Sequence, residues 1–85
     1  MKFNSNKERK VYWEQLVREQ SEEKLETAIN QLKPEIAQVI RMHYKEKVPL
    51  IDIPVKINRS ITVVRNHHNR GIYKLFRYFN PNTLV

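Results

Sequence analysis

The sequence predicts an all-α fold, a small helical bundle of about five helices that contains a helix-turn-helix. Apolar residues recur at steps of three or four from Ser60 to Phe79, which is the period of a long helix with one buried face. Ser5, Ser21 and Ser60 each stand where a helix N-cap is expected, directly before such a segment. No segment shows the alternation of a strand, and 85 residues with 40% hydrophobic content suit one small domain with a thin core.

The first helix is expected from Ser5 to about Gln20. Ser5 and Glu8 fit a capping box, in which both side chains accept hydrogen bonds from free backbone N–H groups of the first turn. An apolar stripe on this helix comprises Trp13, Leu16 and Val17. The simplest interpretation is that the stripe covers the core, and the alternative is a surface for a partner or a second copy.

Two more helices are expected before Lys45. Ser21 opens the first of them, and Glu22 and Glu23 fall in its first turn, where the helix dipole favours acids. Pro34 marks the break and fits the first turn of the following helix, which runs to about Lys45. The apolar stripes of the two helices comprise Leu25, Ala28, Ile29 and Leu32 in the first, and Ile36, Val39 and Ile40 in the second.

Two prolines restrict the next segment. A helix begun at Pro49 would lose the hydrogen bond from Pro54 to the Leu50 carbonyl and would kink. The alternative is a later start with Asp52 as the cap and only about one turn up to Ile57. Either way this helix should be short or bent. The turn that follows contains Asn58, a residue type that tolerates a left-handed backbone.

The last and longest helix is expected from Ser60 to Phe79, ended by Asn80, Pro81 and Asn82. Its inner face comprises Ile61, Val64, His68, Ile72, Leu75, Phe76 and Phe79, and its polar face comprises Thr62, Arg65, Asn66, His67, Asn69, Arg70 and Lys74. Gly71 lies on the inner face, where a glycine weakens the helix. We therefore expect a neighbouring helix to approach the backbone closely at this position.

The positive charge is concentrated in this half of the chain. The formal net charge is +7, and from Ile53 onward there are six Lys and Arg residues and no acid. Such a block suits contact with a phosphate backbone, and the alternative is a solvated basic face that only keeps the protein soluble.

Several function classes find no support in the sequence. There is no pairing of a nucleophile with a base and no glycine-rich phosphate loop, so we expect no enzyme and no cofactor. His67 and His68 face different sides of one helix, His43 lies on another, and the chain has no Cys, so we expect no metal site. No apolar run approaches a membrane span, and nothing suggests a small-molecule ligand. The absence of Cys suits a reducing cytoplasm.

Residues 25 to 77 resemble region 4 of the sigma-70 family of bacterial RNA polymerase sigma factors. The segment from Leu32 to Tyr44, LKPEIAQVIRMHY, is similar to the helix that follows "L-P/T-P" in that family. From Tyr44 to Leu75 the family pattern can be laid down without a gap. The matching positions are Ile53, Ile57, Ser60, Val64, Arg65, Arg70 and Leu75.

The resemblance implies a region 4 fold, winged-helix-like but without strands, that binds promoter-type double-stranded DNA in the bacterial cytoplasm and nucleoid. It places base contacts at Thr62, Arg65 and Asn66, and Arg and Asn are suited to guanine and adenine in the major groove. The candidates for contacts with the DNA backbone are Lys56, Arg59, Ser60, Arg70 and Lys74. RNA polymerase core or a complete sigma factor is the implied protein partner.

Departures from the family pattern support an alternative. Pro54 and Arg59 disturb the motif, and Glu35 replaces an Arg that often contacts the backbone in the family. Ile51 stands where an acid is usual, which adds it to the candidate partner surface. In the alternative, the chain is a protein-interaction module that docks on RNA polymerase or a sigma factor and has a degraded DNA face. Structured RNA is a third possible ligand of the same basic face.

The expected organisation is an N-terminal helix in residues 1–24, a region 4-like domain in residues 25–79 and a tail in residues 80–85. The first part is too small for a second domain. We therefore expect a regulator that acts beside a complete sigma factor, or the region 4 half of a split one.

Overall fold

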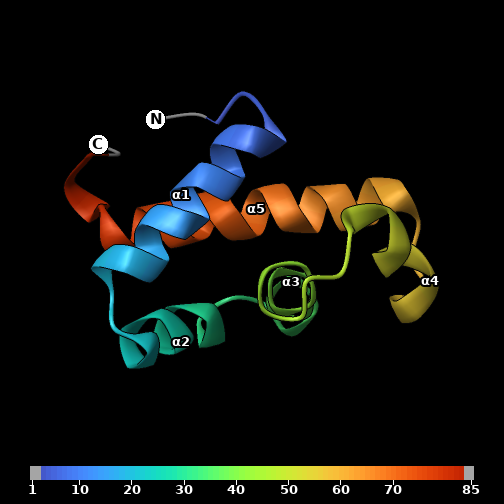
Figure 1. Ribbon diagram of the computed structural model, residues 1–85, viewed down its shortest axis with the longest axis horizontal. Coiled ribbons are helices and arrows are strands. Elements are labelled where there is room, and N and C mark those ends of the chain that lie inside the picture. The colour runs from blue at the N-terminus through green and yellow to red at the C-terminus, as the bar shows by residue number, and fades with distance from the viewer. Residues whose placement is uncertain (1–2, 84–85) are drawn as a thin grey trace.

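Five α-helices joined by short turns account for most of residues 3–83, which are the residues that the computed structural model describes. They are α1 (Asn6–Glu19), α2 (Glu22–Asn30), α3 (Pro34–Ile40), α4 (Ile53–Ile57) and α5 (Ile61–Phe79) (Figure 1). A π-helical turn, Arg41–Lys45, extends α3, and 3-10 turns at Leu50–Asp52 and Pro81–Thr83 precede α4 and follow α5. Residues 3–83 contain no strand, so the all-α prediction is confirmed.

The serine caps are where the sequence predicts them. The hydroxyls of Ser5, Ser21 and Ser60 each accept a hydrogen bond of 3.2 Å from the backbone N–H three residues further on. Glu8 completes the first cap, although its carboxylate accepts from the N–H of Asn4, at 2.6 Å, one residue before the position expected. These contacts fix where α1, α2 and α5 begin, because they satisfy N–H groups that have no partner within the helix.

Helix α5 is the element on which the others pack. In Figure 1 it runs the length of the molecule, α1 lies across it, and α3 is seen almost end-on beside it. Its buried residues are Val64, His68, Gly71, Ile72, Leu75 and Phe76. A Cβ atom on Gly71 would lie 2.6 Å from both Cγ1 and Cδ1 of Ile40. The expected close approach at Gly71 is therefore found, and α3 is the helix that makes it.

The buried face of α1 differs from the stripe that the sequence suggests. Trp13 and Leu16 are only 6% and 2% exposed, and Trp13 stacks on Tyr44 with ring centroids 4.7 Å apart. Tyr12 is buried as well, whereas Val17 is 54% exposed. The buried face of α1 is thus rotated away from Val17 and toward Tyr12, relative to the predicted stripe. The interpretation of Trp13 and Leu16 as a partner surface is wrong, because both side chains already belong to the core of their own chain.

The segment between the prolines combines the two expected alternatives. Pro49 precedes the 3-10 turn, and α4 then covers a little more than one turn. Asp52 occupies the N-cap position, but its side chain makes no capping hydrogen bond. The expectation of a short helix is confirmed. A small buried cluster of Val39, Ile53 and Val64 attaches α4 to α3 and α5.

Asn58 ends α4 in the left-handed conformation, with φ 55° and ψ 53°. The N–H of Arg59 then donates to the Pro54 carbonyl at 3.0 Å, which closes the end of α4. The chain reverses within three residues and enters α5 through the Ser60 cap. The turn thus holds α4 against the first half of α5.

Candidate nucleic-acid interface

The polar face of α5 presents an exposed row of hydrogen-bonding and cationic side chains. Thr62, Asn66, Arg70 and Lys74 follow one another at steps of four, and Arg65 lies beside them; all five are exposed. Residues four apart on a helix lie on the same side, so this row forms a continuous ridge. We call these five residues the outer face of α5. All three candidate base-contact residues lie on it, toward the end of α5 that carries the turn.

Most of the candidate backbone-contact residues are unopposed by acids. Among residues 3–83, Lys56, Arg65, Arg70 and Lys74 take part in no ion pair. Lys56 lies on α4, and Ser60 lies between the two helices, with its hydroxyl engaged as the cap of α5. Cationic groups on α4 and α5 therefore flank the turn without an internal partner, which leaves their N–H donors available to an external anion.

Arg59 is the exception among these residues. Its Nε lies 3.0 Å from Oε1 of Glu35, and its Nη1 donates to the carbonyl of Asn58 at 3.1 Å. The other carboxylate oxygen of Glu35 accepts a hydrogen bond of 2.5 Å from Nε2 of His67. We call Glu35, Arg59 and His67 the Glu35 clasp. The hydrogen bond from His67 and the positive charge of Arg59 lower the pKa of the Glu35 carboxyl.

The Glu35 clasp was not predicted from the sequence. Glu35 and His67 are 32 residues apart, so no local pattern brings them together. The only indication was that Glu35 and Arg59 both depart from the pattern of the resembled family. In the folded chain these two departures pair with each other, and an acid from α3 enters a region whose own sequence has none.

His68 faces the opposite way from His67, into the core. It is 1% exposed, and its Nε2 lies 2.5 Å from the hydroxyl of Tyr44. Its other ring nitrogen, Nδ1, has no hydrogen-bond partner among the described residues. Burial lowers the pKa of His68 to about 4, and electrostatic interactions with His43 and Arg9 act in the same direction. The same burial raises the pKa of Tyr44, so both groups are neutral near pH 7.

A second clustering of charge lies away from the turn, between α2 and the π-helical turn. Glu26 accepts from Arg41 at 2.7 Å and also pairs with Lys45. Hydrogen bonds from these two bases lower the pKa of Glu26. Both bases lie on the π-helical turn. This turn was not predicted from the sequence, because π-helices are rare and occur mostly as single turns within α-helices.

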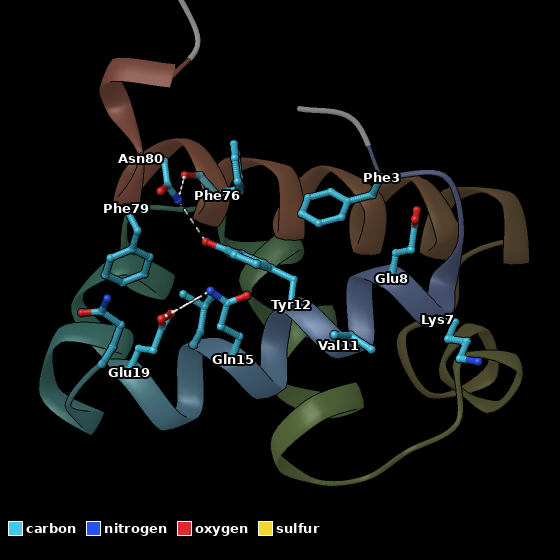
Figure 2. A pocket seen from close by; sticks show the side chains of 12 residues that line it. Phe3, Lys7, Glu8, Val11, Tyr12, Gln15, Glu19, Phe76, Phe79 and Asn80 are labelled. Carbon is cyan, nitrogen blue, oxygen red and sulfur yellow. Dashed lines mark hydrogen bonds between the residues drawn. The ribbon is translucent and has the colours of Figure 1, made fainter.

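A groove lies between α1 and the C-terminal part of α5, remote from α4 (Figure 2). Its volume is about 560 Å³, and its apolar lining includes Phe3, Val11, Tyr12, Phe76 and Phe79. Gln15 donates to Glu19 at 2.8 Å along its edge. Val11 is 52% exposed, so the groove offers apolar surface that the described residues leave uncovered.

Exposed aliphatic side chains also occur at the other end of the molecule. Ile51 is 74% exposed, as a partner surface requires, and Val55 on α4 is 88% exposed. Val55 was not predicted to be exposed, because Pro49 and Pro54 left open which side of α4 faces solvent. No helix among the described residues is long and apolar enough to cross a membrane.

The chain matches no family model, no curated protein and no solved structure.

Proposed function

We propose that this protein is a sequence-specific DNA-binding transcription protein of the sigma region 4 type, in which α4, the turn and α5 form a helix-turn-helix. The observation that carries the proposal is the outer face of α5, an exposed ridge of amide, hydroxyl and cationic groups next to a tight turn. A recognition helix needs such a face because its first turns enter the major groove of the duplex.

Each residue has a distinct role in this proposal. Arg65 and Asn66, with Thr62, contact base edges, where Arg favours guanine and Asn favours adenine. Lys56, Ser60, Arg70 and Lys74 contact phosphates and set the position of the protein on the duplex. Arg59 is available to a phosphate only if it leaves Glu35. The proposed setting is the bacterial cytoplasm, at the nucleoid.

Fluorescence anisotropy with a labelled duplex tests the proposal. With about four to six phosphate contacts, log K should fall with log salt at a slope of about −4 to −5. A labelled RNA hairpin serves as the comparison, because structured RNA is the other ligand that a basic face suits. No duplex binding at low salt, or binding without salt dependence, contradicts the proposal, and a clear preference for the hairpin redirects it to RNA.

We further propose that the protein acts beside a complete sigma factor, or as the region 4 part of a split one. The support is architectural, because within residues 3–83 α1 packs on α5 in one bundle and does not form a unit of its own. Run-off transcription with core polymerase and this chain as the only added factor should give no specific transcript. A specific transcript under these conditions contradicts this part of the proposal.

The groove favours a second candidate, a module that docks on RNA polymerase or a sigma factor. It lies between α1 and the part of α5 farthest from α4, and Val11 on α1 exposes apolar surface there, so a protein partner in the groove leaves the outer face free. The two candidates are separable by experiment, since docking through the groove does not need the cations of α4 and α5.

A further inference from the structure

The Glu35 clasp lies at the surface beside the N-terminus of α5. The side chains of Arg59, Glu35 and His67 are 49%, 34% and 21% exposed. Solvent screens charges at such exposure, so the clasp contributes little to folding stability. Arg59 lies in the turn itself, and Glu35 and His67 are connected to it through the clasp. We therefore look for a role of the clasp in binding at this surface and not in folding stability.

The donors in the clasp are the kind that bind phosphate. Guanidinium and imidazole N–H groups that converge on a carboxylate make the same charge-assisted hydrogen bonds to phosphate oxygens. Each oxygen of Glu35 accepts from a different donor, one on the turn and one on α5, at 3.0 Å and 2.5 Å. The carboxylate thus occupies the space between two donors that a phosphate oxygen would otherwise fill.

The clasp also lies where the duplex backbone must pass. Arg59 immediately precedes Ser60, the cap of α5, and His67 is one residue after Asn66 on the same helix. When the first turns of a recognition helix enter the major groove, the turn and the flanks of that helix face the phosphates. A bound duplex therefore meets a negative charge at Glu35 and finds Arg59 already neutralised.

We infer that Glu35 is an electrostatic brake on duplex binding: it holds Arg59 and His67 in the manner of a phosphate and so lowers affinity for DNA. The inference rests on the proposed function and concerns the regulation of the same site. Neutralising Glu35 removes a repulsive charge and releases Arg59. It should therefore tighten duplex binding about tenfold near 0.1 M salt and make the salt slope steeper by about 0.9, the value of one added phosphate contact.

Glu35→Gln and Glu26→Gln form a matched pair for the test. Each substitution removes one negative charge that pairs with two basic groups, but the partners of Glu26 lie on the π-helical turn and not on the turn before α5. Anisotropy is measured with one duplex between about 50 and 200 mM NaCl. Glu35→Gln should give the tighter binding and steeper slope. Glu26→Gln should change Kd less than about threefold and leave the slope unchanged, because salt screens distant charges.

Arg59→Gln supplies a second measurement, in case Glu35→Gln impairs folding. If Glu35 already holds Arg59 away from phosphate, then Arg59→Gln in the otherwise unchanged chain should leave the salt slope unchanged, although the unpaired carboxylate of Glu35 then repels the duplex and lowers the affinity. Arg70→Gln removes a cation without an internal partner and should weaken binding about tenfold. In the Glu35→Gln background, Arg59→Gln should make the salt slope shallower by about 0.9, as Arg70→Gln does in the unmodified chain.

The outcomes separate this inference from the proposed function. If the unmodified chain binds duplex but Glu35→Gln binds no tighter than Glu26→Gln, the brake is refuted and the proposed function stands. An equal decrease of the salt slope from Arg59→Gln and Arg70→Gln in the unmodified chain refutes it as well. If neither the unmodified chain nor any variant binds duplex at low salt, the proposed function itself fails. Thermal melting of each variant identifies those that do not fold.

Discussion

At the scale of single residues, the chemistry of this protein depends on which way adjacent side chains point. His67 and His68 are neighbours in sequence, yet one pairs with Glu35 at the surface and the other is 1% exposed against Tyr44. The buried ring must stay neutral, because burial penalises its charged form. The two histidines therefore act in different places, His67 at the surface beside Glu35 and His68 in the core.

His68 makes the fold sensitive to mild acid. Its pKa is about 4 in the folded protein and 6.5 as an ordinary value, so the unfolded chain binds a proton first as pH falls. The contribution of neutral His68 to the free energy of unfolding is fully present above about pH 6.5. It is lost as the pH falls to about 4, by an amount on the order of 3 kcal/mol. Urea unfolding at pH 7, 6 and 5 should show this decline.

His68→Gln serves as the control, because glutamine keeps a hydrogen-bonding group beside Tyr44 without titrating. The decline between pH 7 and 5 should then disappear. The lowered pKa values of Glu26 and Glu35 act only below about pH 4.5, where their carboxyls become protonated, so they leave this window unaffected. A free energy of unfolding that is constant from pH 7 to 5 in the unmodified protein would contradict the assignment.

If α5 binds DNA as proposed, the residues that contact bases and those that contact phosphates should differ in how their loss affects specificity. Arg65→Ala and Asn66→Ala should each reduce discrimination between a preferred and a random duplex by about 1–3 kcal/mol. Lys74→Ala should weaken binding to both duplexes equally. The measurement is a pair of Kd values for each variant, and identical losses on both duplexes for all three variants would count against the division of roles.

At the scale of elements, the contact between α3 and α5 at Gly71 controls how closely the two helices pack. Gly71→Ala improves helix propensity by about 1 kcal/mol. It also places a methyl group 2.6 Å from Cγ1 and Cδ1 of Ile40, so this fully buried side chain must shift. Overpacking of a core costs about 1–3 kcal/mol, so the net effect should be a lower melting temperature, by several degrees.

Ile40→Val provides the compensating change, since it deletes Cδ1, one of the two atoms in contact. Combined with Gly71→Ala, it should restore part of the lost stability, so that the double variant melts higher than the sum of the single effects predicts. A melting temperature several degrees above that of the unmodified protein for Gly71→Ala alone would show that the position is roomy.

The elements also show what a sequence can predict and what it cannot. The serine caps, the short α4 and the left-handed Asn58 follow from local chemistry, so residues close together in sequence were sufficient to predict them. The Glu35 clasp, the π-helical turn and the rotation of α1 toward Tyr12 depend on contacts between distant segments. In the candidate site, the exposed row on α5 followed from helix period, but the neutralisation of Arg59 did not.

At the scale of the whole molecule, the turn and the groove lie at opposite ends of α5. A single substitution can therefore disrupt one of these surfaces and leave the other intact. Val11→Asp places a charge at the groove, where the side chain is 52% exposed, so the fold should tolerate it. If a transcription partner docks there, the variant should lose capture by RNA polymerase or a sigma factor and keep its duplex Kd within about twofold. Lys74→Ala should weaken duplex binding and keep partner capture. Loss of both activities in Val11→Asp would point to misfolding.

The uninterrupted helix α5 has a further consequence for how weak contacts combine. It has 19 residues, so it is about 28 Å long, with the turn at one end and the groove at the other. A protein seated in the groove is thereby held within that distance of any duplex bound at the turn. Such tethering gives an effective concentration in about the millimolar range. A partner whose own affinity for DNA is far too low to retain it on a promoter would therefore remain bound there through this chain.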